Sequence, residues 1–529
     1  MKRLFKKVFS RFSLVALTII LIFIVEVLVI VGGVFVIEKI VTDAYPGAGV
    51  YVDWTLRVID WLIMAVTVIH CANRDMVPET KIPWLLCITL LNIFGVAIYV
   101  VFSSNRPSRR QRRTFESLYG RMKEYTVREI DKEQVLSAMG KWADVSEALY
   151  TENPFAVMHA GTKTEYFPSG EQFAARLLED LENAREYIFM EYFIVAKGKF
   201  WNAVLDVLKR KAAEGVEVRF IYDDIGSVSR VRAGYPKLMR KAGIKCMKFN
   251  PFVPVISNVH NNRDHRKITV IDGKIGYTGG INLADEYVNL EQPYGHWKDT
   301  AVRLEGKGVK NFIAYFLGTW HMRDRCVQPE DELELYTPEE YEFFEDEGYV
   351  QPYADGPRPL YQQQIGEDVY INILNSAKKY VYIATPYLII DYRMREAIKL
   401  AAERGVEVRI LTPHIPDKKL VFSLTRSNYM SLMKSGVKIY EYTPGFVHAK
   451  SFLADDEVGV VGTINLDYRS FLHHYEDAVF MYKTKALQGL KEDMEECFSF
   501  SALQTEEQAK RNVFSRAITS VAKLFAPLF

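Results

Sequence analysis

Cysteine is scarce in this chain of 529 residues, and its few copies are scattered. There are five cysteines, and no two of them form a Cys-x-x-Cys pair. Isolated cysteines supply neither the ligand set of a zinc site nor the framework of a disulfide-stapled domain. We therefore expect a fold that depends on neither.

The chain also lacks an excess of charge of one sign. It has 67 Lys and Arg against 66 Asp and Glu, for a net charge of +1. A protein that binds nucleic acid along a groove is expected to carry a long basic surface with stacking aromatic residues. The charge balance gives no support to that class, and we expect no nucleic-acid partner.

Apolar residues, in contrast, form three runs near the N-terminus, at residues 13–37, 58–71 and 82–103. A helix needs about 20 apolar residues to span a bilayer. The first run is longer than the apolar core of a cleaved signal peptide, which favours an uncleaved anchor. The second run is short, and the third is the most convincing span. We expect residues 1–105 to form a membrane anchor of two or three transmembrane helices, in a multi-pass protein of the cell membrane.

Basic residues flank this anchor on both sides, at positions 2–11 and 106–113. Both clusters should prefer the cytoplasmic face, which requires an even number of crossings. Three apolar runs give an odd number. We expect three crossings, with residues 58–71 as the segment on which the answer depends.

A second feature is a duplicated motif. His-x-Lys-x4-Asp occurs at His265 and again at His448, and each copy is followed by glycine and then asparagine. The spacing agrees without a slip, because 448 − 265 and 465 − 282 both give 183. A repeat of this kind indicates a duplicated structural unit.

The residue types in the motif suit chemistry on a phosphate diester. Histidine is the side chain best adapted to nucleophilic attack or proton transfer near neutral pH. Lysine two residues later lies on the same side of an extended segment, and asparagine adds a neutral donor. One set from each copy would form a compact cationic site. The candidates are His265, Lys267, Asp272, Asn282, His448, Lys450, Asp455 and Asn465.

Strands alternate with helices around each motif. This pattern indicates an α/β fold with a largely parallel, possibly mixed sheet in each of two facing domains. The expected strand–helix–strand units are 187–194, 200–214 and 216–222, then 380–384, 394–404 and 406–411. The expected segments after the anchor are a basic helical linker at 106–150, domains at 151–330 and 361–500, an acidic linker at 331–360 and an amphipathic tail at 501–529.

The doubled motif resembles the phospholipase D superfamily. Gly445-Phe-Val-His-Ala-Lys, Gly-Thr-Ile-Asn-Leu-Asp-Tyr-Arg-Ser at 462–470 and the apolar N-terminal segments are similar to bacterial cardiolipin synthases. The resemblance implies duplicated phospholipase D-like domains with the active site at their interface. It implies that His265 attacks phosphorus and that His448 protonates the leaving oxygen, although the sequence alone does not order the two histidines.

The same resemblance implies a carboxylate that orients each histidine. We expect these to be Asp299 and Glu476, with Glu286 and Asp477 as rivals. Lys267, Lys450, Asn282 and Asn465 would hold the phosphate oxygens, so neither a metal nor a cofactor is expected. Asp272 and Asp455 are included with the site as motif members, but each precedes a turn between strands, which favours a structural role. His473 and His474 depart from the apolar or amide residues that are common there; we expect surface or packing roles for both.

The implied reaction transfers a phosphatidyl group from one phosphatidylglycerol to another, which yields cardiolipin and glycerol. The partners are thus phosphatidylglycerol and membrane lipids, and the oligomeric state stays unknown. Three alternatives are open. A phospholipase D-type hydrolase or a membrane-tethered nuclease would use the same residues, and a non-enzymatic scaffold would use none of them.

Overall fold

A computed structural model describes residues 49–103, 132–232, 234–251, 261–322, 329–345, 347–358 and 360–528, with isolated positions elsewhere. The expected span at 13–37 and the basic clusters at 2–11 and 106–113 lie almost wholly outside these ranges. The chain divides into an N-terminal unit up to Asn105 and a catalytic unit that contains nearly all of the remaining residues.

The N-terminal unit contains helices α3 (Gly49–Asn73), α4 (Pro78–Leu91) and α5 (Ile93–Phe102). Within the described residues, one helix is long and apolar enough to cross a membrane, over Asp53–Asn73. The run at 58–71 is therefore part of a longer helix than its apolar letters indicate. The expectation of one continuous span at 82–103 is wrong, because Asn92 ends α4 in a conformation with a positive φ of 53°.

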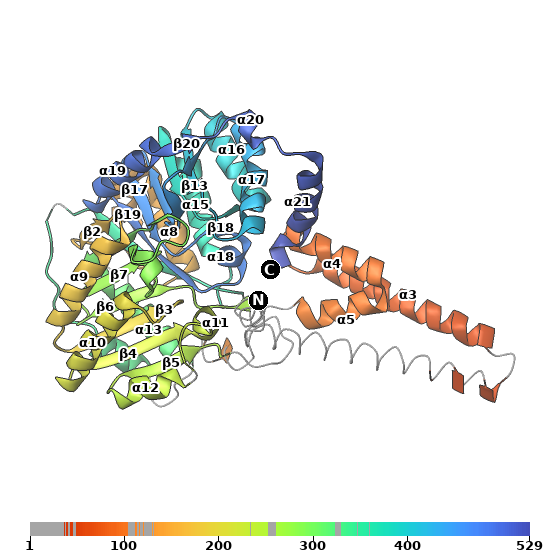
Figure 1. The fold of residues 1–529 in the computed structure, drawn as a ribbon, viewed down its shortest axis with the longest axis horizontal. Coiled ribbons are helices and arrows are strands. Elements are labelled where there is room, and N and C mark those ends of the chain that lie inside the picture. Colours follow the sequence, from red (N-terminus) through yellow and green to blue (C-terminus); the bar gives the residue numbers. More distant parts are fainter. Residues whose placement is uncertain are drawn as a thin grey trace, which may run out of the picture. The chain divides into compact units, whose positions relative to one another are not determined.

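Helices α4 and α5 fold back on each other as a hairpin (Figure 1). Gly95 lies so close to α4 that a Cβ there would come 2.0 Å from the Cys87 carbonyl oxygen. Trp84 meets Tyr99 edge-on at 5.6 Å between ring centroids. Contacts between residues on the two sides of Asn92 mean that the chain reverses direction, so both ends of the hairpin lie near each other.

The first half of the catalytic unit is built on a seven-stranded mixed sheet in the order β2-β9-β7-β6-β3-β4-β5. Strands β3, β4 and β5 are parallel, and the remaining neighbours are antiparallel. Gly198 precedes helix α10 (Lys199–Ala213), whose apolar face covers the sheet. The strands are β2 (Lys163–Phe167), β3 (Tyr187–Tyr192), β4 (Glu217–Asp223), β5 (Lys245–Phe249), β6 (Lys267–Ile271), β7 (Ile275–Gly279) and β9 (Ala301–Glu305).

The second half repeats this plan in a nine-stranded sheet in the order β1-β10-β19-β17-β16-β11-β13-β14-β20. Its central strands match those of the first half one for one, with β11, β13 and β14 parallel. The duplication expected from the motifs is thus present in the strand order. The strands are β1 (His159–Ala160), β10 (Tyr349–Asp355), β11 (Tyr380–Ala384), β13 (Glu407–Pro413), β14 (Lys438–Tyr442), β16 (Ser451–Ala454), β17 (Val458–Gly462), β19 (Glu476–Tyr482) and β20 (Ser501–Leu503).

Several elements lie where linkers or a tail were expected. Strand β10 falls in the acidic segment at 331–360 and pairs along its whole length with β19. The segment at 106–150 ends in α7 (Lys132–Met139) and α8 (Ala143–Glu152). The tail contains β20, which extends the second sheet, and helix α21 (Val513–Phe525).

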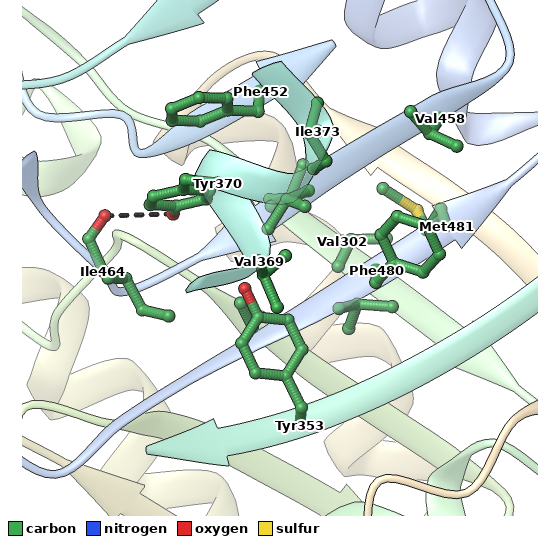
Figure 2. Close-up of a cluster of buried hydrophobic side chains, with 14 of the residues drawn as sticks. Val302, Tyr353, Val369, Tyr370, Ile373, Phe452, Val458, Ile464, Phe480 and Met481 are labelled. Atoms are coloured by element: carbon green, nitrogen blue, oxygen red, sulfur yellow. Dashed lines mark hydrogen bonds between the residues drawn. The ribbon is translucent and has the colours of Figure 1, made fainter. Parts of the chain in front are cut away.

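The two halves share a buried core. Figure 2 shows Val302 of the first half among side chains of the second, including Phe480 and Met481. In the same cluster, Tyr370 stacks on Phe452 at 3.9 Å, and its hydroxyl donates to the Ile464 carbonyl at 3.2 Å. Ile464 directly precedes Asn465, so this packing inside the second half also positions one motif loop.

Candidate active site

The two ends of each motif meet because a β-hairpin folds them together. Strands β6 and β7 are antiparallel, so His265, just before β6, and Asn282, just after β7, lie at the same edge of the sheet. Strands β16 and β17 do the same for His448 and Asn465. The spacing that is conserved between the two copies is therefore the length of one hairpin.

Each histidine binds a carboxylate from the other half of the molecule. His265 Nδ1 lies 2.8 Å from Glu476 Oε2, and His448 Nδ1 lies 2.7 Å from Asp299 Oδ2. The rival carboxylates take other partners: Asp477 accepts from the Lys267 backbone amide, and Glu286 pairs with Arg230. Neither half of the chain contains a complete site.

Backbone hydrogen bonds between the two halves hold each histidine beside its carboxylate. The His265 amide donates to the Tyr475 carbonyl at 2.8 Å, and the His448 amide donates to the Lys298 carbonyl at 2.7 Å. Each carbonyl belongs to the residue just before the orienting carboxylate. Strand β8 (His296–Lys298) also runs parallel to β15 (Gly445–Val447) across the two halves.

Each carboxylate determines which nitrogen of its histidine ring is free to react. Nδ1–H donates to the carboxylate, which leaves the Nε2 lone pair free to act as nucleophile or base. Burial lowers the pKa of both rings, to about 4 for His448 and well below its usual range for His265, where both lysines and His448 add to the effect. Burial raises the pKa of Asp299, but His448 and Lys450 outweigh it and the pKa lies below its usual range.

The two lysines are buried cations beside the histidines. Lys267 Nζ donates to the His265 carbonyl at 2.5 Å, and Lys450 Nζ lies 2.9 Å from His448 Nδ1. Burial lowers the pKa of Lys267 to about 8 and that of Lys450 to about 7. A buried ammonium is costly unless it faces an anion, so these side chains favour a negatively charged ligand.

The motif asparagines present amide groups at the same edge. Asn282 Oδ1 accepts from the Ile194 amide at 2.9 Å, which aims its nitrogen away from the backbone. That Nδ2 is buried and has no hydrogen-bond partner among the described residues, and the same holds for Asn465 Oδ1. An unused amide donor beside two lysines suits a phosphate oxygen.

Asp272 and Asp455 lie at the opposite end of each hairpin. The Asp272 carboxylate accepts from the backbone amides of Arg185, Glu186 and Tyr187 at 2.8–2.9 Å. The Asp455 carboxylate accepts from Lys378, Lys379 and Tyr380 at 2.7–3.0 Å. Each therefore holds the start of a neighbouring strand, β3 or β11, which is a structural role and places neither at the reacting atoms.

His474 lies beside His265, which the sequence did not indicate. Of the surface or packing roles expected for it, burial excludes the surface role, and its ring lies 5.2 Å from that of His265. Its Nδ1 lies 3.4 Å from Glu476 Oε1. The matching place in the other copy is taken by Trp297, whose ring is also 5.2 Å from His448 and whose Nε1 lies 3.4 Å from Asp299.

The place of His474 also bears on metal binding. Ligand atoms of His265, His474 and Glu476 lie within 4.8 Å of one another, a spacing at which three groups can share an ion. A sequence signal for the position of His474 was present, because His474 stands two residues before an orienting carboxylate, as Trp297 does in the other copy.

Comparison with known proteins agrees with this geometry. The halves match a family model described as "Cardiolipin synthase, PLD-like domain" over residues 177–320 and 370–498. The fold resembles the phosphatidylserine synthase of Haemophilus influenzae with a TM-score of 0.54 at 14% identity, over 74% of this chain and all of that one. The class is therefore a two-domain phospholipase D-like protein.

Full-length relatives narrow the class. A cardiolipin synthase of Alkalihalophilus pseudofirmus is 33% identical over 92% of this chain and 96% of its own length. An uncharacterized protein of Streptococcus mutans is 41% identical over 87% of this chain and 99% of its own. The chain belongs to the cardiolipin synthase family of phosphatidyltransferases.

Proposed function

We propose that this chain makes cardiolipin by transferring a phosphatidyl group from one phosphatidylglycerol to the hydroxyl of another, with release of glycerol. The observation that carries the proposal is the crossed pair of histidine–carboxylate contacts, each flanked by a motif lysine and asparagine. The family of full-length relatives supports the choice of lipid.

In the first step, His265 Nε2 attacks phosphorus, a P–N bond forms and the bond to the glycerol oxygen breaks. His448 gives its proton to that oxygen. In the second step, the hydroxyl of the acceptor lipid attacks, His448 takes the hydroxyl proton, and the P–N bond breaks. A covalent intermediate splits one difficult displacement into two easier ones. Lys267, Lys450 and the two motif asparagines hold the non-bridging oxygens as negative charge builds.

The assignment of roles follows from charge. A nucleophile must be neutral, whereas a general acid must be able to carry a proton. Burial, both lysines, His448 and Arg469 lower the pKa of His265. Burial and both lysines also lower the pKa of His448, but there the Asp299 carboxylate acts in the opposite direction and favours the protonated ring. We therefore assign the neutral nucleophile to His265 and the general acid to His448. The phosphate of a bound substrate would raise the pKa of His448 toward the working pH.

Incubation of the purified full chain with labelled phosphatidylglycerol tests the reaction. Cardiolipin and glycerol in equal amounts are expected. Phosphatidic acid as the main lipid product would mean that water captures the intermediate and that the chain is a phospholipase D-type hydrolase. Cleavage of nucleic acid, with no lipid product, would favour the nuclease alternative.

We also propose a revised membrane topology. The α4–α5 hairpin has helices of 14 and 10 residues, which reach only about 21 and 15 Å. The hydrocarbon core is about 30 Å thick. The hairpin would therefore enter and leave by one face, so residues 13–37 and α3 would supply two crossings. Two crossings put the basic clusters at 2–11 and 106–113 on one face, in agreement with the charge rule.

Single cysteines in a cysteine-free chain test this topology. Ser10→Cys, Asn73→Cys and Ser108→Cys are expected to react with an impermeant thiol reagent from the same side. Tyr45→Cys, between the two crossings, is the control and should react from the other side. Labelling of Ser108→Cys from the side of Tyr45→Cys would restore the three crossings first expected.

A further inference from the structure

A basic cavity of about 900 Å³ lies outside the active site, between helix α17 (Lys419–Met433), the short α20 (Glu506–Ala509) and α21. Its described lining contains a single acidic residue, Glu506. The cations that line it are Arg426, Lys434, Lys510, Arg511, Arg516 and Lys523.

Most of these cations have no carboxylate partner. Arg426 pairs with Glu441 at 3.0 Å, whereas no ion pair is present for the other five among the described residues. Lys523 Nζ instead donates to the neutral Asn428 Oδ1 at 2.8 Å, and Arg511 donates to the Ser515 carbonyl at 2.9 Å. The cavity therefore holds a concentration of positive charge that the protein itself does not neutralise.

Neighbouring positive charges lower the pKa values of two of these cations. Burial, together with Arg395 and Arg511, lowers the pKa of Lys523 to about 8. Burial and the neighbouring Arg426 and Arg516 also lower the pKa of Arg511. Like charges held together destabilise a fold unless an anion binds among them.

The outer side of α21 identifies the kind of anion. The residues of α21 that line the cavity have the spacing of one side of a helix. They are Arg516, Thr519, Ser520 and Lys523. The exposed apolar side chains of the helix are Val513, Ile518, Val521 and Phe525, with 81%, 48%, 60% and 38% of their surface accessible. The side of α21 that faces away from the cavity is thus apolar, and the side that faces the cavity is cationic. An amphipathic helix of this kind is typical of one that lies in a membrane surface among lipid headgroups.

We propose that this cavity binds the phosphodiester headgroup of an anionic phospholipid, while α21 rests its apolar side in the acyl region of the same leaflet. The site goes beyond the proposed reaction, because its lining contains neither His265 nor His448. Its role would be to hold the catalytic unit against anionic lipid, the same lipid class that the proposed function uses.

Hydrogen exchange of α21 in the full chain, reconstituted in nanodiscs, tests the proposal. Slow exchange of the Val513–Phe525 amides is expected in nanodiscs that contain phosphatidylglycerol, and fast exchange in those made of phosphatidylcholine alone. Each cation near an anionic surface contributes about fivefold to membrane binding. The double variant Lys510→Gln with Arg516→Gln should therefore weaken the binding of α21 to phosphatidylglycerol nanodiscs by about 25-fold, which is read as lost protection from exchange. Neither residue belongs to the active site, so synthesis can be measured separately.

A matched pair of exposed cations in the same unit, Lys237→Gln with Lys241→Gln on α12 (Tyr235–Lys241), controls for lost charge and should behave as wild type. Equal protection in both kinds of nanodisc would mean apolar insertion only and would overturn the proposal. Protection by inorganic phosphate with phosphatidylcholine nanodiscs would assign the cavity to a soluble anion instead. Because exchange is read without catalysis, a chain that failed to make cardiolipin would still give a clear result here.

Discussion

Glu476→Gln is the substitution that most directly tests the crossed site. The carboxylate is fully buried, and its Oε2 lies 2.8 Å from His265 Nδ1 in the other half of the catalytic unit. Glutamine has nearly the same shape but no charge. A hydrogen bond to a charged group contributes about 1.5–3 kcal/mol, which corresponds to about 10- to 150-fold in rate. A glutamine N–H turned toward Nδ1 would also force hydrogen onto Nε2 and block attack.

We therefore expect kcat to fall by about 100-fold, measured as cardiolipin formed from labelled phosphatidylglycerol at saturating lipid. Asp299→Asn should cause a similar loss through His448. Glu286→Gln is the matched control, since that carboxylate pairs with Arg230 and touches neither histidine. The thermal unfolding midpoint of each variant shows whether it is folded. A folded Glu476→Gln variant within about threefold of wild-type kcat would refute the orienting role.

Other predictions follow from the same geometry. Acid quenching of a His448→Ala variant should trap phosphatidyl label on His265, and label elsewhere would reverse the assigned roles. Because burial lowers the pKa of Lys450 to about 7, its charge is lost as pH rises through that value; kcat/KM should fall there, and Lys450→Arg should move the fall to higher pH. Asp272→Asn should lower the unfolding free energy by about 1–3 kcal/mol and leave kcat nearly unchanged. Chelation should leave most activity, and full loss restored by one divalent ion would show that the His474 cluster holds a catalytic metal.

The sequence predicted the duplicated fold and the motif side chains because both follow from local pattern. A hairpin of constant length returns asparagine to the edge where histidine begins, so the equal spacing of the two copies already implies equal geometry. The strand–helix–strand units were likewise predicted close to β3, α10 and β4 and their counterparts β11, α16 (Tyr392–Glu403) and β13.

The partner of each histidine could not be predicted in this way. Asp299 and Glu476 each follow one motif, and the sequence does not say which histidine either serves. That depends on how the halves pack. The pairing of β8 with β15 brings Asp299 to His448, and a separate bridge between Asp264 and Tyr475 brings Glu476 to His265. The contact between His474 and His265 also depends on this packing, since the two residues are 209 positions apart, from 474 − 265. The sequence shows only that His474 stands two residues before Glu476, as Trp297 stands before Asp299.

Hydropathy alone does not predict the helix break in the N-terminal unit. A continuous apolar run at 82–103 has the length of a span, and its hydropathy alone does not distinguish a straight helix from two short ones. The difference is made by Asn92, which adopts a positive φ, and by Gly95, which lets α5 approach the backbone of α4. Asparagine is among the few residues that tolerate such a conformation. In the topology proposed above the hairpin does not cross, and the conflict between three apolar segments and two basic clusters would disappear, because residues 13–37 and α3 would supply an even number of crossings.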